Sequence, residues 1–218
     1  MKPENRERKN EIKAINAIQL CEEQKEAKRL IIDNQVVIIT GNAGTGKTIV
    51  AANTCLDFLA KKQISKIYCT RALVEVGKSM GFLPGMASEK LNPYLVPFLD
   101  NLSKCSNPKF TADLVESKKV EGLAISFIRG ITIDDILVVE EAANTTKHEM
   151  LAILTRLGKN GKIVIVGDLF QCDTRDPNNG LAYVIEMSKR IEEIKHIKLK
   201  SNHRSDLVAK ILNYEYNK

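Results

Sequence analysis

The chain has 218 residues, of which 44% are hydrophobic and 28% are charged, as is typical of one globular domain with its own core. No apolar run approaches the ~18 residues of a membrane span, and the charged start lacks the apolar segment of a signal peptide. Five cysteines without a Cys-x-x-Cys pair indicate reduced thiols, so we expect a cytoplasmic protein with no membrane partner.

The formal net charge of +6 is unevenly distributed along the chain. Residues 61–120 contain ten Lys and Arg against five Asp and Glu, whereas residues 121–185 contain six against nine and residues 186–218 eight against five. Basic flanks around an acidic middle suit a protein that holds a nucleotide in one place and a polyanion in another. An ordinary solvated basic surface explains the charge almost as well.

The first part of the chain divides into a charged segment and the start of a domain. Residues 1–12 are charge-dense and are expected to fray, which leaves residues 13–218 as one domain. A helix is expected from Lys13 to Ile31, and Gln24 within it lies seventeen residues before Gly41. A glutamine amide can accept from N6 of adenine and donate to N7. Taken alone, however, Gln24 is more simply a surface residue.

A glycine-rich stretch follows the apolar residues Val36–Ile39, which predict a buried strand, and precedes a helix expected to run to about Lys61. It fits the P-loop spacing GxxxxGK[ST] in the sequence Gly41-Asn42-Ala43-Gly44-Thr45-Gly46-Lys47-Thr48. In such a loop, backbone N–H groups surround phosphates without an intervening Cβ. Lys47 can reach the β- and γ-phosphates, and the Thr48 hydroxyl can bind Mg²⁺. We therefore expect ATP and Mg²⁺ at this site.

The middle of the chain is expected to alternate between strands and loops. A strand is expected over Lys66–Thr70. The Gly- and Pro-rich stretch at residues 77–98 predicts a long loop of defined conformation. Such a loop either carries function or packs its own apolar side chains for stability. A short strand is expected over Ala124–Ile128, ending at Arg129 and Gly130.

An uninterrupted apolar run at Ile136–Val139 is typical of a central parallel strand, and it places Glu140 and Glu141 at its carboxyl end. Glu140 is predicted to hold the Mg²⁺ shell, and Glu141 to align and activate the attacking water. Two exposed acids at a strand end are the alternative interpretation.

The last third completes an α/β pattern. Thr146 and Glu149 form a capping-box signature, and the strand that ends before Gly167-Asp168-Leu169-Phe170-Gln171 places Gln171 where it can contact a γ-phosphate. The expected elements are a helix over Lys147–Arg156, a strand over Lys162–Val166, a helix over Leu181–Ile191, a strand over His196–Leu199 and a helix over Ser205–Tyr216. Such alternation predicts a doubly wound α/β fold with a mainly parallel sheet.

These motifs resemble those of the PhoH-like P-loop ATPases, single RecA-like domains similar to the first motor domain of superfamily 1 helicases. The resemblance covers residues 20–214 and rests on the stretches GNAGTGKT, TRALVEVG with GFLPG, SFIRG, VVEEAANTT, LTRLG and VGDLFQ. It implies ATP hydrolysis coupled to RNA or single-stranded DNA. It also implies roles for Gln24 at adenine, Gln171 as γ-phosphate sensor and Arg204 as the arginine of the C-terminal motif.

Three departures from the family pattern leave a weakly active ATPase open. The acidic pair of the family usually begins with Asp, where this chain has Glu140. Ala143 stands where a glutamine is expected, and Ala72 where a proline is expected. A nucleotide-gated interaction module therefore remains an alternative, and a small-molecule kinase a weaker one because no arginine-rich lid is visible.

Assembly is the last expectation from the sequence. Stabilising the charge on a γ-phosphate usually takes an arginine, supplied in cis or in trans. We expect a homo-oligomer, most simply a ring of six, in which Arg129 or Arg156 reaches a neighbouring subunit. A monomer completed by its own Arg204 is the alternative.

Overall fold

The computed structural model describes residue 15, residues 18–72, 87–173 and 176–203, and residues 207, 208, 210 and 214, and it leaves out the side chains of residues 87–94. Several sequence-based expectations lie outside these residues. They are the charged segment 1–12, the Gly-rich part of the 77–98 stretch, Arg204 and most of the helix expected over Ser205–Tyr216.

A six-stranded sheet forms the centre of the molecule, in the order β3-β2-β4-β5-β1-β6, and every neighbouring pair is parallel. The strands are β1 (Val36–Gly41), β2 (Ile67–Arg71), β3 (Val120–Gly122), β4 (Ile136–Glu140), β5 (Lys162–Gly167) and β6 (Ile194–Leu199). The predicted doubly wound α/β fold is thus confirmed. Because β5 lies between β1 and β4, the P-loop and the acidic pair open onto the same edge of the sheet.

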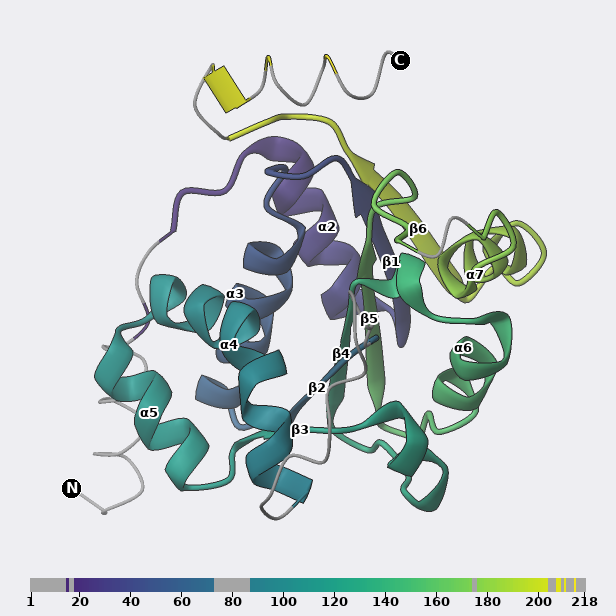
Figure 1. Cartoon of the computed structure of the whole chain (residues 1–218). Coiled ribbons are helices and arrows are strands. Elements are labelled where there is room, and N and C mark those ends of the chain that lie inside the picture. Colours follow the sequence, from purple (N-terminus) through teal and green to yellow (C-terminus); the bar gives the residue numbers. More distant parts are fainter. Residues whose placement is uncertain are drawn as a thin grey trace.

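Helices cover both faces of the sheet (Figure 1). One face carries α2 (Glu22–Asp33), α3 (Lys47–Ala60), α4 (Ala87–Cys105) and α5 (Pro108–Glu116). The other carries α6 (Lys147–Leu154), α7 (Gly180–Ser188) and the 3₁₀ turns η1 (Ile125–Gly130) and η2 (Ala142–Asn144). Strand residues alternate between two cores: Val37 and Ile39 pack on the α3 side, and Ile38 packs on the α6 side. Burial on both faces explains why the strands read as continuous apolar runs.

The strand expected over Ala124–Ile128 is wrong, because this segment forms the 3₁₀ turn η1. Ile128 is fully buried while Phe127 beside it is 68% exposed, and Ile125 three positions earlier packs on the same core. Core-facing side chains three residues apart are typical of a 3₁₀ turn and not of a strand. The edge of the sheet is formed instead by β3, which pairs with β2.

The loop expected through residue 98 is also wrong in its second half, because α4 begins at Ala87 and runs through Pro93 and Pro97. Prolines inside a helix usually break it. Here the apolar side chains of Leu95, Phe98 and Leu102 form one stripe that is buried in the core, and this packing outweighs the helix-breaking tendency.

Other boundaries shift by less. α2 begins at Glu22, well after the expected Lys13, and β6 begins two residues before the expected His196. The capping box of Thr146 and Glu149 is confirmed at the start of α6. Helix α5 was not expected; Asn107 caps it by accepting from the Phe110 N–H. Within the described residues, no helix is both long and apolar enough to cross a membrane.

Candidate functional site

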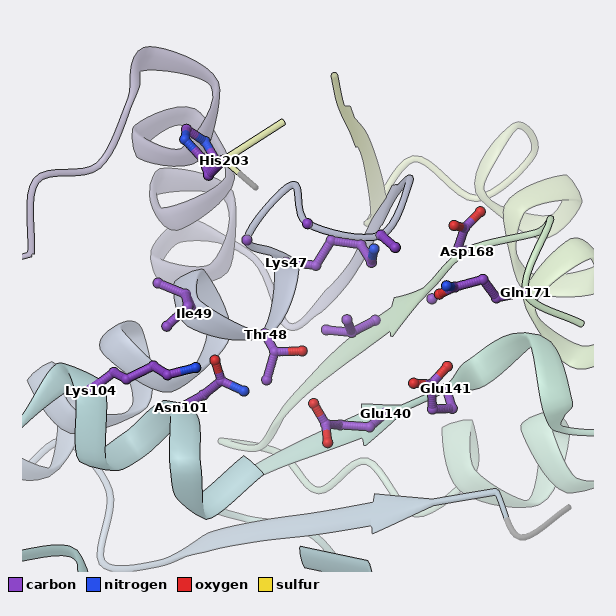
Figure 2. Close-up of a pocket in the computed structure, with 15 residues that line it drawn as sticks. Lys47, Thr48, Ile49, Asn101, Lys104, Glu140, Glu141, Asp168, Gln171 and His203 are labelled. Atoms are coloured by element: carbon purple, nitrogen blue, oxygen red, sulfur yellow. The ribbon is translucent and has the colours of Figure 1, made fainter. Parts of the chain in front are cut away.

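A pocket of about 530 Å³ lies where β1, β4 and β5 end, a volume in the range of small-molecule sites (Figure 2). It is lined by Ala43, Gly44, Gly46, Lys47, Thr48, Ile49, Asn101, Lys104, Glu140, Glu141, Val166, Gly167, Asp168, Gln171 and His203. The predicted phosphate-binding residues, the acidic pair and Gln171 therefore meet in one pocket. Gly41, Asn42, Thr45 and Gln24 are not among the residues that line it.

The P-loop conformation depends on glycine, as its first and last glycines show. Gly41 has φ 145°, and a Cβ there would lie 2.5 Å from the carbonyl oxygen of Leu199 in β6. Gly46 has φ 81° and is the left-handed N-cap of α3. Side chains rarely adopt such backbone angles, so the sharp turn from β1 into α3 requires glycine. The turn points the amino end of a helix, with its partial positive charge, at the pocket.

Lys47 lies across this loop. Its Nζ donates to the carbonyl oxygens of Gly41 at 2.7 Å and Asn42 at 3.0 Å. The hydroxyl of Thr45 also donates to the Asn42 oxygen, at 2.9 Å. The ammonium is thus held inside the curve of the loop, where an incoming phosphate would meet it.

Gln24 is buried behind the loop rather than open to the pocket. Its Oε1 accepts from the Cys21 backbone N–H at 3.1 Å, and its Nε2 donates to the Thr45 carbonyl at 3.0 Å. Both ends of the amide that would recognise adenine are therefore bonded to the backbone of the chain itself. The role of Gln24 at adenine stays a prediction that requires this arrangement to open.

Glu140 faces Thr48 from the last position of β4, and its carboxylate points toward the threonine in Figure 2. Glu140 is only 5% exposed, and this burial raises the pKa of its carboxyl. A hydrogen bond from Thr48 and the charge of Arg71 lower the pKa, and the neighbouring Glu141 raises it. A buried carboxylate beside a hydroxyl is a pair of hard oxygen ligands that fits a divalent cation.

Glu141 leaves the strand in a left-handed conformation, with φ 50° and ψ 42°. The turn directs its carboxylate away from Glu140 and toward Gln171 and Asp168 (Figure 2). Its Oε1 lies 3.4 Å from Nη2 of Arg71, the last residue of β2. Glu140 is thus buried beside Thr48, whereas Glu141 is half-exposed beside the open pocket. These different surroundings suit the different roles predicted for the two acids.

Gln171 follows β5 in a tight turn that Asp168 organises. Asp168 is 3% exposed, its carboxylate accepts from the Phe170 N–H at 3.1 Å, and its carbonyl accepts from the Gln171 N–H at 3.0 Å. The turn fixes the backbone from which the Gln171 side chain enters the pocket (Figure 2).

Among the lining residues that were not predicted as site residues, three come from α4 and from the segment after β6. Asn101 and Lys104 lie three positions apart on α4, which brings them to one face of that helix. Both lie after the predicted loop of residues 77–98, and their approach to the pocket depends on how α4 packs against the core. His203 follows β6, and its backbone N–H donates to the Gly44 carbonyl at 3.0 Å.

The arginines expected near a γ-phosphate are not among the described residues of the pocket. No arginine lines it in the part of the chain that the structure describes, and Arg204 lies outside that part. Arg129 contacts His148, and Arg156 donates to the Arg129 carbonyl at 2.8 Å, so both lie on the η1 and α6 side. Neither arginine reaches the pocket of its own chain.

Two residues that depart from the family pattern, Ala143 and Ala72, lie close to strands of the sheet but outside the pocket. Ala143 is 1% exposed and packs in the core on the α6 side, where its carbonyl accepts from the Cys172 thiol at 3.2 Å. Ala72 directly follows β2 and is 7% exposed. Neither residue lines the pocket.

Solved structures with the same fold include a large terminase and a helicase. The large terminase of a thermophilic bacteriophage aligns with a TM-score of 0.56 and 11% identity, over 92% of this chain and 50% of the terminase. The Pif1 helicase of Candida albicans aligns with a TM-score of 0.50 and 17% identity, over 92% of this chain and 44% of the helicase. At such low identity these matches show the fold alone, a RecA-like P-loop NTPase domain.

Sequence comparison is more specific. The PhoH-like protein of Bacillus subtilis (strain 168) is 40% identical over 193 residues, which cover 87% of this chain and 60% of the relative. The PhoH-like protein of Mycobacterium leprae (strain TN) is 37% identical over 200 residues, covering 88% of this chain and 57% of the relative. The chain thus spans less than two thirds of the length of these relatives. A sequence model described as "PhoH-like protein" matches residues 16–215, and the chain therefore belongs to the PhoH-like family of P-loop nucleotide-binding proteins.

Proposed function

We propose that this protein hydrolyses ATP with Mg²⁺ and couples hydrolysis to the binding of RNA or single-stranded DNA. One observation carries the hydrolytic part: the P-loop lysine, the Thr48–Glu140 pair and Glu141 line a single pocket at the carboxyl ends of parallel strands. Ligands bind at this edge in open α/β folds.

Each residue has a task that its position suits. The loop N–H groups and Lys47 bind the phosphates, and Gln24 binds adenine once its amide is released from Cys21 and Thr45. Glu141 orients a water molecule and accepts its proton as the water attacks the γ-phosphate. Gln171 contacts the same phosphate and loses that contact when the phosphate leaves.

Thr48 and Glu140 would hold Mg²⁺. Within the described residues no group of three or more acidic, Cys or His side chains is arranged to hold a metal ion. Two protein ligands suit Mg²⁺, which typically takes one or two and fills the rest of its shell with water and phosphate oxygens. When bound, the ion neutralises charge that develops on the phosphates.

Charge supports a nucleic-acid partner. Residues 61–120, which include β2 and α4, carry ten basic against five acidic side chains. Phosphate backbones bind such surfaces through many weak, salt-sensitive contacts. The fold neighbour Pif1 is named a helicase, which is consistent with the proposal. The five free cysteines fit a reducing compartment, so we place the protein in the cytoplasm.

We also propose that the active form is a homo-oligomer, most simply a hexameric ring. The described lining of the pocket has no arginine, and Arg129 and Arg156 lie on a different side of the domain. Mixing Lys47→Ala subunits with Arg129→Ala or Arg156→Ala subunits should restore hydrolysis if that arginine acts across an interface. A protein that sediments as a fully active monomer would instead assign the task to Arg204.

The deciding experiment measures phosphate release from ATP, with Mg²⁺ or EDTA, in the presence and absence of poly-RNA and single-stranded DNA. We expect hydrolysis that requires Mg²⁺ and rises with nucleic acid, and binding that weakens by about 0.7 log units per released counterion for each log unit of salt. ATP binding without hydrolysis favours the nucleotide-gated module. Transfer to an acceptor without phosphate release indicates the kinase.

A further inference from the structure

The ion pair between Arg71 and Glu141 joins two strand ends that flank the pocket. Arg71 ends β2, Glu141 follows β4, and these strands are neighbours with Arg71 in register with Glu140. Arg71 Nη2 lies 3.4 Å from Glu141 Oε1, and the two side chains are 28% and 35% exposed. One carboxylate oxygen of the proposed general base is therefore occupied by a cation from the adjacent strand.

We propose that Arg71 is a positioning residue that restrains Glu141, and that hydrolysis accelerates when a phosphate of a bound nucleic acid takes over Arg71. The proposal rests on the proposed function, because it assigns Glu141 to the water. It deepens that function by naming the contact through which nucleic acid would regulate the rate.

The restraint follows from the geometry of Glu141. Its backbone is fixed in the left-handed conformation that starts η2, so the carboxylate can move only through its own side-chain torsions. A carboxylate oxygen that faces a guanidinium directs a lone pair to the cation, and this lone pair is then not available to a water. While the pair persists, Glu141 spends less time aligned with the attacking water, and hydrolysis is slower.

The pair is also weak enough to be released. At 3.4 Å the contact is long for a charge-assisted hydrogen bond, and partly exposed ion pairs add little stability. A phosphate can accept two parallel N–H groups from a guanidinium, which a single carboxylate oxygen at this distance does not. Arg71 is exposed enough to be reached, and it belongs to the strand that opens the basic region 61–120.

The test compares Arg71→Ala and Arg71→Lys with the parent in steady-state ATP hydrolysis. We expect Arg71→Ala to raise basal kcat on the order of two- to fivefold, as suits a partly exposed ion pair, with KM for ATP unchanged. Stimulation by poly-RNA should shrink by the same factor, because the restraint that RNA relieves is already absent. Arg71→Lys keeps a cation and should retain most of the restraint.

Two controls separate this role from others. Lys28→Ala breaks the Lys28–Asp57 pair between α2 and α3, whose side chains are 23% and 28% exposed, and it should leave kcat and stimulation unchanged. Arg71 also lowers the pKa of Glu140. A change at the metal site would alter the Mg²⁺ concentration for half-maximal rate, whereas the proposed restraint changes kcat at saturating Mg²⁺.

The outcomes are distinguishable. A basal kcat that falls or stays constant in Arg71→Ala overturns the restraint, provided that the parent hydrolyses ATP and Glu141→Gln does not. If neither the parent nor Arg71→Ala hydrolyses ATP, the proposed function itself fails, and the restraint with it. A parent that hydrolyses ATP and an Arg71→Ala variant that is faster and whose stimulation by poly-RNA is reduced by the same factor support both.

Discussion

The two sides of the pocket are constructed in different ways. On the phosphate side the geometry is set by backbone: Gly41 and Gly46 adopt positive φ, and the ammonium of Lys47 is held by two carbonyls. On the acidic side it is set by side chains, with Glu140 buried near Thr48 and Glu141 held by Arg71. We conclude that changes on the first side should act on binding, and changes on the second on rate and pH response.

The largest effect is expected on the phosphate side. Lys47→Ala removes the charge that meets the β- and γ-phosphates, so nucleotide binding and hydrolysis should fall to background. Calorimetric titration with ATP and phosphate-release assays measure the two losses. Lys61→Ala, at the exposed C-cap of the same helix, is the matched control and should behave like the parent.

On the acidic side, Glu141→Gln should keep ATP bound while hydrolysis slows by about 10²–10⁴-fold, the usual contribution of a general base. The amide preserves size but cannot accept the proton of the water. Single-turnover kinetics together with ATP affinity distinguish this from a binding defect. Parent-like hydrolysis in this variant would refute the assignment of Glu141.

The smallest effect is one of stability against pH. The raised pKa of Glu140 means that the folded state binds its proton more tightly than the unfolded state does. The charged carboxylate therefore destabilises the nucleotide-free fold above the raised pKa, and this cost disappears as pH falls below the ordinary value of 4.5.

Glu140→Gln should accordingly raise the melting temperature of the nucleotide-free protein at pH 7–8, with a difference that narrows toward pH 4. For a chain of this size, each 1 kcal/mol changes Tm by about 2–4 °C, which scanning calorimetry resolves. An increase in Tm of equal size at pH 7–8 and at pH 4 would show that the added stability of Glu140→Gln comes from packing and not from removal of a buried charge.

The sequence predicted best those site residues that directly follow a predicted strand. Gly41–Thr48, Glu140 with Glu141, and Gln171 each follow an apolar run, and parallel strands deliver their carboxyl ends to one edge. The structure brings Lys47, Thr48, both acids and Gln171 into one pocket, as expected.

The remaining features of the site depend on tertiary contacts. Asn101 and Lys104 reach the pocket because core packing keeps α4 helical through two prolines, which local propensity opposes. The His203 N–H reaches Gly44 only because β6 lies beside β1, a pairing that no local pattern specifies. Spacing singled out Gln24, whose role at adenine stays a prediction, but its bonds to Cys21 and Thr45 depend on how α2 docks against the loop.

The position of β6 has a further consequence, for the order of folding. Strand β1 carries the P-loop, and one of its two partners is β6, so that Val36 pairs with Ile194 far along the chain. Contacts of such long sequence separation form late, because a large loop must close before they contribute. During synthesis, a ribosome therefore releases the P-loop segment long before its second partner exists. We expect the β1 amides that bond to β6 to gain protection from hydrogen exchange only after β6 has docked, so that the nucleotide site is among the last parts of the domain to be completed.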